Sequence, residues 1–426
     1  MHKSIRFQLS VIKYMSKKKI FIIVAVVLVL LVIGLAGYYF ITLSKQNQAG
    51  STAAATKTFT PFGGAGYSGT TTGFSSTTAS SQQASNNQTN YTKKLRELWN
   101  QPTSGAGILD SKAGSTVRFV DQATGFVYET QLFSPIQNRL SNTTIPLAYN
   151  AVWDAANNSF VAQYLADDNT VSTNVMTLKS SGSVGTSTGQ TISGFSLSTN
   201  VSSVSVLGET VFYLQSFTGL SQGFISTIDG KTKKQIWQSP ISELSAQMVS
   251  ANSVALTTKP YQNIPGFVYL VSTASGSVKK LLGDVPGLVT LVSPDASEVL
   301  YSTQSDAGSQ MALYNVKTNT AQNTTPATFP EKCVWSKKDT TIVYCAVPEN
   351  SLDGTSLTAW YMGQISFADD IWKYDLKQNT ASIIERLTND AGEQIDVIKP
   401  MLSDSEQYLV FTNKIDGTLW SLDLTK

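Results

Sequence analysis

The side chains that most often carry enzyme chemistry are scarce in this sequence. His2 is the only histidine among 426 residues, so an imidazole base or metal ligand is restricted to the extreme N-terminus. Two carboxylate pairs, Asp167-Asp168 and Asp369-Asp370, have the residue types of an acid/base dyad or a calcium site. Adjacent strand residues point to opposite faces, so we interpret each pair as part of a turn or a solvated edge. The sequence predicts no catalytic residue.

Two short motifs resemble functional signatures but lack the surrounding sequence that such signatures need. Gly185-Thr186-Ser187-Thr188-Gly189 has the spacing of a nucleophile elbow, yet its Ser/Thr-rich neighbourhood predicts no strand-to-helix turn. Gly230-Lys231-Thr232 ends like a phosphate-binding loop, although Ile225 stands where the first glycine is required. We interpret the second motif as a turn between strands. We therefore expect no cofactor, and a glycan hydrolase or lyase assembled from distant carboxylates remains the alternative.

The spacing of the two cysteines is typical of a structural disulfide. Cys333 and Cys345 flank a predicted hairpin whose turn centres on Asp339, so symmetric pairing places them opposite each other. Redox catalysis would more often use a Cys-x-x-Cys spacing. Two cysteines without histidine cannot complete a tetrahedral zinc site, so no metal is expected. We predict a disulfide, which requires an oxidising compartment.

Three segments precede the first predicted strand of the main domain. Residues 1–19 contain six Lys and Arg and no acidic residue, which marks a cytoplasmic tail. Residues 20–43 contain no charge and are long enough to span a hydrocarbon core of ~30 Å. Their length and the absence of a nearby cleavage site favour an uncleaved anchor in the lipid bilayer. Residues 44–90 are rich in Ser, Thr and Gly, which predicts a flexible linker.

This order predicts a single-pass protein of the cell membrane, with its N-terminus in the cytoplasm and the remainder outside. His2 then lies across the membrane from the main domain. No Asp or Glu occurs before Glu97, and from there on 20 basic residues stand against 29 acidic ones, a net charge of −9. Nucleic acids and anionic lipids are therefore not expected as partners of the exported part.

Residues 93–426 show short β-patterns separated by turn signals, with a repeat of about 40 residues. Each repeat reads as a four-stranded antiparallel unit, and no long helical pattern occurs after the apolar stretch. We predict an all-β fold, a β-propeller of seven blades, with six or eight as the alternatives. The sequence ends after the third strand of its last repeat. Residues 94–100 match the missing outer strand, so we expect them to close the ring and cover its edge.

The repeats resemble a known bacterial family. Ser293-Pro294-Asp295, the strand Val299-Leu300-Tyr301 and the strand Leu313-Tyr314-Asn315-Val316 resemble the TolB-type propeller repeat of envelope proteins. The resemblance covers about residues 93–426 and is strongest in the last three repeats. The whole layout, including residues 118–129, is similar to uncharacterised membrane-anchored propellers of bacteria of the Candidate-Phyla type. The resemblance implies an interaction platform and brings no catalytic residues with it.

The candidate binding residues lie in the longest insertion within a repeat, residues 347–368. This segment contains Trp360, Tyr361, Met362 and Phe367, and aromatic side chains and methionine are enriched at contact surfaces. It joins the second and third strands of its repeat, on the face where propellers usually bind ligands. Alternatively, these side chains cover the channel mouth of their own ring.

We therefore expect a non-enzymatic binding or scaffolding module that docks an envelope protein or a cell-wall polymer. The carboxylate-based glycan hydrolase or lyase is the rival class. Two acidic side chains converging at a channel mouth would favour the enzyme, and a channel lined by Ser, Thr and aromatic residues would favour binding. A cytoplasmic partner for residues 1–19 is a third possibility.

Overall fold

The computed structural model describes residues 58–59, 93–145, 147–166, 170–179 and 190–426. The predicted tail, anchor and linker lie outside these residues, apart from Thr58–Phe59. No helix of the described residues is long and apolar enough to cross a membrane, and residues 20–43 lie outside those residues.

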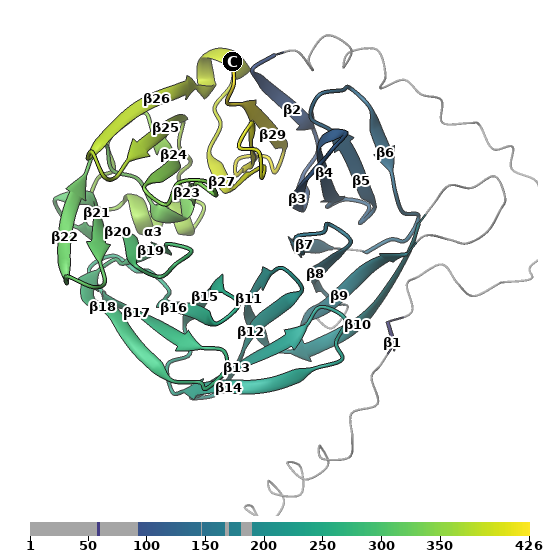
Figure 1. Ribbon diagram of the computed structural model, residues 1–426, viewed down its shortest axis with the longest axis horizontal. Coiled ribbons are helices and arrows are strands. Elements are labelled where there is room, and N and C mark those ends of the chain that lie inside the picture. The colour runs from purple at the N-terminus through teal and green to yellow at the C-terminus, as the bar shows by residue number, and fades with distance from the viewer. Residues whose placement is uncertain (1–57, 60–92, 146, 167–169, 180–189) are drawn as a thin grey trace, which may run out of the picture. The chain divides into compact units, whose positions relative to one another are not determined.

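Seven antiparallel sheets surround a central opening (Figure 1). The prediction of a seven-bladed β-propeller is confirmed. Blades 1 to 3 consist of β3 (Thr103–Ser111), β4 (Gly114–Asp121), β5 (Val127–Gln131) and β6 (Gln137–Arg139); β7 (Ala148–Trp153), β8 (Ser159–Leu165), β9 (Val171–Lys179) and β10 (Thr191–Thr199); and β11 (Val201–Leu207), β12 (Thr210–Phe217), β13 (Leu220–Thr227) and β14 (Lys233–Ser239). A short strand, β1 (Thr58–Phe59), pairs with β10.

Blades 4 to 7 continue the ring. They consist of β15 (Leu244–Ser250), β16 (Ser253–Thr258), β17 (Pro265–Ser272) and β18 (Val278–Pro286); β19 (Val289–Val292), β20 (Glu298–Ser305), β21 (Gly308–Asn315) and β22 (Thr320–Thr324); β23 (Cys333–Trp335), β24 (Ile342–Pro348), β25 (Asp369–Asp375) and β26 (Thr380–Arg386); and β27 (Val397–Leu402), β28 (Tyr408–Asn413), β29 (Leu419–Asp423) and β2 (Leu95–Trp99). The short helices η1 (Pro330–Lys332), α3 (Ser356–Tyr361) and α4 (Leu387–Ala391) lie in connections.

Burial follows the position of a strand within its blade. Every residue of the second strand β24 is buried, because blades pack against both of its faces. The fourth strand β22 has only one buried residue, Thr324, because it forms the rim of the ring. Apolar side chains therefore concentrate in the inner three strands, and polar ones in the outer strand, which is the pattern that made the repeats visible in the sequence.

The repeated serine in the first turn of a blade has a direct structural role. Ser293 is 1% exposed, and its Oγ accepts a hydrogen bond from the backbone N of Glu298 (3.0 Å). Ser403 is 0% exposed, and its Oγ accepts from the backbone N of Tyr408 (3.1 Å). The serine thus satisfies a backbone donor at the start of the returning strand, which explains why it recurs at this turn.

The ring closes through its N-terminal strand, as the sequence predicts. β2 pairs antiparallel with β29, with Leu95 opposite Leu422. Lys94 forms an ion pair with Glu385 of blade 6 (Nζ–Oε2, 2.8 Å). On the other side, Nη1 of the buried Arg96 donates to the backbone oxygen of Gln131 in blade 1 (3.2 Å). One strand therefore completes blade 7 and binds both neighbouring blades.

The predicted disulfide is also present. Cys333 and Cys345 are paired residues of β23 and β24, with their Cα atoms 4.0 Å apart. Both are buried, at 4% and 1% exposure. The bond links the inner two strands of blade 6 and belongs to the hydrophobic core between blades 5 and 6.

Loss of the closing strand's core contact should weaken the whole ring. Leu98 is 1% exposed and packs with Val117, Phe119 and Val410, so Leu98→Ala should lower the free energy of unfolding by about 2–5 kcal/mol. The exposed Asn100 lies just beyond β2, and Asn100→Ala should change it by less than about 0.5 kcal/mol. Denaturant titration measures both. Equal effects would contradict the role assigned to β2.

Candidate binding site on the insertion face

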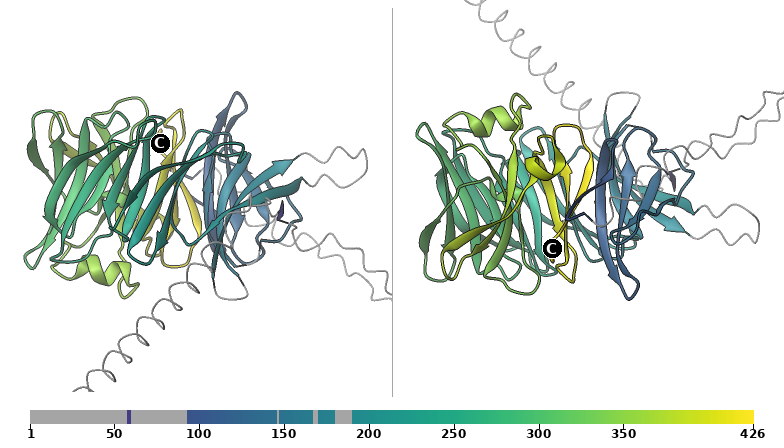
Figure 2. Two further views of the ribbon diagram at one scale, coloured as in Figure 1. Left: turned by 90° about the horizontal axis from the view of Figure 1, so that it is seen from below. Right: turned by 90° about the horizontal axis from the view of Figure 1, so that it is seen from above.

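One face of the ring carries the long connection of blade 6, residues 349–368, which we call the insertion. The connections between the second and third strands of each blade lie on the same face as the connections between blades. We call this face the insertion face. Helix α3 of the insertion stands on it (Figure 2). The sequence predicts that this segment joins the second and third strands of its blade, on the face of the connections between blades, and this placement is confirmed.

The insertion leans away from its own blade. In β20 of blade 5, Gln304 Nε2 donates to the backbone oxygen of Asp353 (2.6 Å). At the far end, the backbone N of Gln262, in the β16–β17 connection of blade 4, donates to Thr358 Oγ1 (3.3 Å). The insertion of blade 6 thus crosses blade 5 and reaches the edge of blade 4.

A lysine and two aspartates lie together beside the insertion, and all three side chains are 0% exposed. Lys332, the last residue of η1, places Nζ 2.7 Å from Asp369 Oδ2 and 2.5 Å from Asp396 Oδ1. Asp369 begins β25 and Asp396 immediately precedes β27, so the cluster joins blades 6 and 7. Charges at this depth need partners, because an unpaired buried charge is strongly unfavourable.

This cluster fixes the aromatic residues of the insertion. Asp396 Oδ2 accepts hydrogen bonds from Trp360 Nε1 (2.7 Å) and from the backbone N of Phe367 (3.2 Å). Lys332 Nζ lies 5.0 Å from the ring centre of Trp360 and 5.2 Å from that of Phe367, within range of a cation–π interaction. Phe329 packs on both rings. The inner side of the insertion is thus held by charge as well as by apolar packing.

Two carboxylates share one ammonium group here, and this affects the protonation of Asp369. Burial raises the pKa of Asp369 from 3.8 to about 6, against the opposing effect of Lys332. The neighbouring Asp396 raises this pKa further, while the hydrogen bond from the backbone N of Val397 lowers it. Within the described residues, Asp369 Oδ1 has no hydrogen-bond partner.

The interpretation of Asp369-Asp370 as a turn or solvated edge is wrong. The two side chains do point in opposite directions, but both are buried within β25. Asp369 pairs with Lys332, and Asp370 Oδ2 lies 3.3 Å from Arg386 Nη1. The partners come from elsewhere in the chain, so the local sequence alone did not indicate burial. Asp167-Asp168 and the Gly185–Gly189 motif lie outside the described residues.

A pocket opens between the inner strands of blades 4 and 5. It has a cavity volume of about 290 Å³ and is bounded by β15, β16, β19, η1 and the end of α3. Its wall is mixed, with apolar groups from Leu288 to Leu291 beside hydroxyl, amide, carboxylate and phenol groups. The residues that provide these polar groups are Ser245, Gln247, Thr257, Thr290, Glu331 and Tyr361.

Glu331 supplies the carboxylate of this pocket. Its side chain is exposed to the pocket, yet protein atoms surround it, and this desolvation raises its pKa from 4.5 to about 6. A hydrogen bond from the Tyr361 hydroxyl and the positive charges of Lys332 and Lys414 act in the opposite direction. Desolvation by the surrounding protein and the neighbouring Glu331 raise the pKa of Tyr361, although part of its side chain is exposed. Both groups therefore keep a proton longer than they would in water as the pH rises.

The four predicted binding residues occupy different environments. Trp360 is 3% exposed and its ring faces the ion cluster, and Phe367 is half-buried beside it. Tyr361 and Met362 are 43% and 65% exposed. The insertion therefore both packs against its own ring through Trp360 and Phe367 and presents Tyr361 and Met362 to solvent. Whether these residues contact a ligand stays a prediction.

Sequence reasoning missed Glu331, Lys332 and Asp396. The available signal was their position, since each lies in a connection that leads into the inner strand of a blade. Such connections end at the channel mouth.

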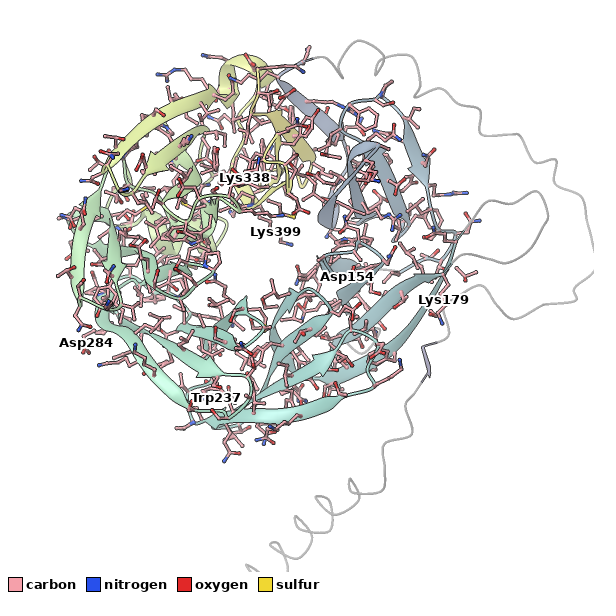
Figure 3. All side chains as sticks on the ribbon, in the orientation of Figure 1. Asp154, Lys179, Trp237, Asp284, Lys338 and Lys399 are labelled. Carbon is pink, nitrogen blue, oxygen red and sulfur yellow. A yellow bond between two sulfur atoms is a disulfide. The ribbon has the colours of Figure 1, made fainter. Side chains whose placement is uncertain are left out.

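The central opening holds a further cation. Lys399, in the inner strand β27, points into it (Figure 3), and its Nζ donates to Asn150 Oδ1 (2.9 Å) and to the backbone oxygen of Ser104 (3.3 Å). Surrounding protein lowers the pKa of Lys399. The lysine therefore links blade 7 to blades 1 and 2 across the opening. In the described segments, no three His, Cys, Asp or Glu side chains gather in a way that could hold a metal ion.

The motif that resembles the end of a phosphate-binding loop is a turn between strands, as expected. Gly230-Lys231-Thr232 connects β13 to β14, and the backbone N of Lys231 donates to Asp229 Oδ1 (3.1 Å). Gly230 has φ +73°, a conformation that favours glycine.

Solved structures with a similar fold share little sequence with this chain. TolB from Acinetobacter baumannii has a TM-score of 0.39 at 12% identity, over 65% of this chain and 62% of the TolB chain. Oligogalacturonate lyase from Vibrio parahaemolyticus has a TM-score of 0.47 at 9% identity, over 77% and 93% of the two chains. An oligogalacturonate lyase in complex with manganese has a TM-score of 0.44 at 10% identity, over 76% and 98%.

These values are too low to support an argument about function. The seven-bladed assignment rests on the sheet topology of this chain itself. The TolB match spans less than two thirds of the TolB chain. No protein-family profile matches the sequence, and no curated protein matches it significantly.

Removal of the buried ammonium group should be costly. Lys332→Met would leave Asp369 and Asp396 without their cation, so we expect the free energy of unfolding to fall by about 3–5 kcal/mol. Lys337 pairs with Asp404 at the surface, and Lys337→Met should cost only about 0–1 kcal/mol. Denaturant titration compares the two. A small loss for Lys332→Met would mean that the cluster is not a structural anchor.

Asp369 should make the fold more stable in mild acid. Its pKa is about 6 in the folded state and 3.8 ordinarily, so the folded state binds the proton more tightly. The stabilisation is complete below about pH 3.8 and is lost as the pH rises through about 6. In Asp369→Asn this contribution is absent. The unfolding free energy of the wild type minus that of the variant should therefore decrease between pH 4 and pH 7, whereas a constant difference would contradict the raised pKa.

Proposed function

We propose that this protein is a membrane-anchored, exported propeller that binds an envelope protein or a cell-wall polymer on its insertion face. The observation that carries the proposal is the pocket of about 290 Å³ beside the exposed Tyr361 and Met362. A concave site with an apolar wall and a few polar groups is the usual form of a binding site.

The distribution of carboxylates supports binding over catalysis. Of the described carboxylates, the pocket wall contains only Glu331. The nearby Asp369 and Asp396 are 0% exposed and engaged by Lys332, so they do not present themselves to a ligand in the pocket. Glycoside hydrolysis needs two carboxyl groups on either side of the bond that is cleaved. A carboxylate-based glycan hydrolase or lyase is therefore the weaker candidate.

The membrane location is proposed from the sequence. Residues 20–43 are uncharged, and six Lys and Arg with no acidic residue precede them, which favours a cytoplasmic N-terminus. The Cys333–Cys345 disulfide agrees with an oxidising compartment for the propeller.

A reporter fused after Lys426 tests this orientation. Alkaline phosphatase should be active there, because it folds only outside the cytoplasm, and a cytoplasm-dependent fluorescent protein should stay dark. The opposite pair of results would place the propeller in the cytoplasm and contradict the proposed location.

Site-specific photo-cross-linking in intact cells tests the binding proposal. A photoreactive amino acid at Met362, which is 65% exposed on the insertion face, should form adducts with an envelope protein or with wall fragments. The control position is Ile136, which is 52% exposed on the opposite face. Adducts at position 362 alone are expected. No adducts at 362, or equal adducts at both positions, would contradict binding on the insertion face.

A further inference from the structure

Exposed apolar side chains are unevenly distributed between the two faces of the ring. Of the 15 large apolar side chains that are exposed in the described residues, ten lie at the insertion face, four at the opposite face and one on the outer strand β26. Tyr261 and Ile264 belong to the blade 4 connection that contacts α3. Tyr361 is the last residue of α3, and Met362 comes directly after it. Four of the ten therefore belong to the two segments beside the pocket, which contribute Pro260 and Tyr361 to its wall.

Charge is uneven as well. The described connections of the insertion face contain nine Asp and Glu and three Lys, a net charge of −6. The connections and chain ends of the opposite face contain nine Lys and seven Asp and Glu, a net charge of +2. The described chain also enters the ring on that opposite face, at residue 93, because β2 runs towards the insertion face. The insertion face thus combines negative charge with exposed apolar surface.

Within the pocket, most polar groups of the wall already have partners. Thr257 Oγ1 and Thr290 Oγ1 are 2.6 Å apart. The Gln247 side chain donates to and accepts from the backbone of Val292 (2.8 and 3.0 Å), and Ser245 Oγ donates to the backbone oxygen of Thr257 (3.3 Å). Glu331 accepts a hydrogen bond from the Tyr361 hydroxyl, but no ion pair joins its carboxylate to a cation of the described residues.

The charges around Glu331 do not neutralise it. Lys332 and Lys414 are positive, and Asp369, Asp396 and Glu331 itself are negative. Their sum is −1 when all are ionised. A desolvated carboxylate in such a site gains the most interaction free energy from a ligand that carries a positive charge.

We propose that the pocket receives the Lys or Arg side chain of a basic, amphipathic segment of a partner protein, with Glu331 as its counter-ion. Tyr261, Ile264, Tyr361 and Met362 contact the apolar side of the same segment. The aliphatic Ile264 and Met362 favour a protein over a sugar polymer, since apolar contacts of this kind are typical of protein interfaces. This inference rests on the proposed function and names the chemistry of its partner.

Selection from a displayed library of random 12-residue peptides, with the full-length protein in detergent as the target, tests the inference. The enriched peptides should share one Lys or Arg next to apolar residues. Their affinity, measured by fluorescence anisotropy, should fall about tenfold or more in Glu331→Gln, as expected for loss of a desolvated charge pair. Glu393→Gln removes an exposed acid of the same face outside the pocket and should leave the affinity within about twofold. The melting temperature of both variants serves as the folding control.

Three results would overturn the inference. Enriched peptides without a basic position, or peptides that bind Glu331→Gln as well as the wild type, would remove Glu331 as the counter-ion. Binding of glucosamine oligomers that depends on Glu331, with no peptide enriched, would replace the protein partner by an amino-sugar polymer. Self-association that Glu331→Gln abolishes would assign the pocket to a second copy of the chain. In each case, adducts at position 362 would still support binding on this face, whereas their absence would contradict the proposed function itself.

Discussion

Closure of the ring is the constraint on which the other features depend. A blade in a propeller buries both of its faces only when it has a neighbour on each side. β2 supplies the fourth strand of blade 7 and at the same time binds blade 1 through Arg96 and Leu98. Without it, β29 would expose a row of backbone donors and acceptors. The inner strands around the channel keep their mutual positions because this closure is complete.

The candidate site depends on a second, local constraint. Lys332 binds the start of β25 and the residue before β27 through two carboxylates. Asp396 then holds Trp360 by its indole N–H, so the insertion is fixed at its inner side. The outer side of the same segment, at Tyr361 and Met362, is left exposed. Rigid placement of exposed apolar groups lowers the entropic cost of binding, since fewer side chains need to be ordered when a ligand docks.

Sequence reasoning predicted the parts of this structure that repeat. The turn serine and the alternation of buried strands recur, so the blades could be predicted. The last repeat breaks this pattern by lacking a fourth strand, which pointed to the closing strand, and the hairpin symmetry pointed to the Cys333–Cys345 pairing. The ion cluster could not be predicted, because Lys332, Asp369 and Asp396 come from three separate connections and strands and show no shared spacing. Asp369-Asp370 looked like a polar turn for the same reason. The insertion was found as a contact segment, but its division into a buried Trp360 and an exposed Met362 depends on partners from distant parts of the chain.

The position of β2 has a mechanical consequence. Residue 93 is where the described ring connects to the preceding chain, and two residues later that chain becomes the closing strand. A pulling force applied at residue 93 would therefore reach the β2–β29 pairing before any other part of the ring. The ion pair of Lys94 with Glu385 and the hydrogen bonds of Arg96 would take up this tension first. The same strand that seals the ring is thus the element through which force applied at residue 93 would open it.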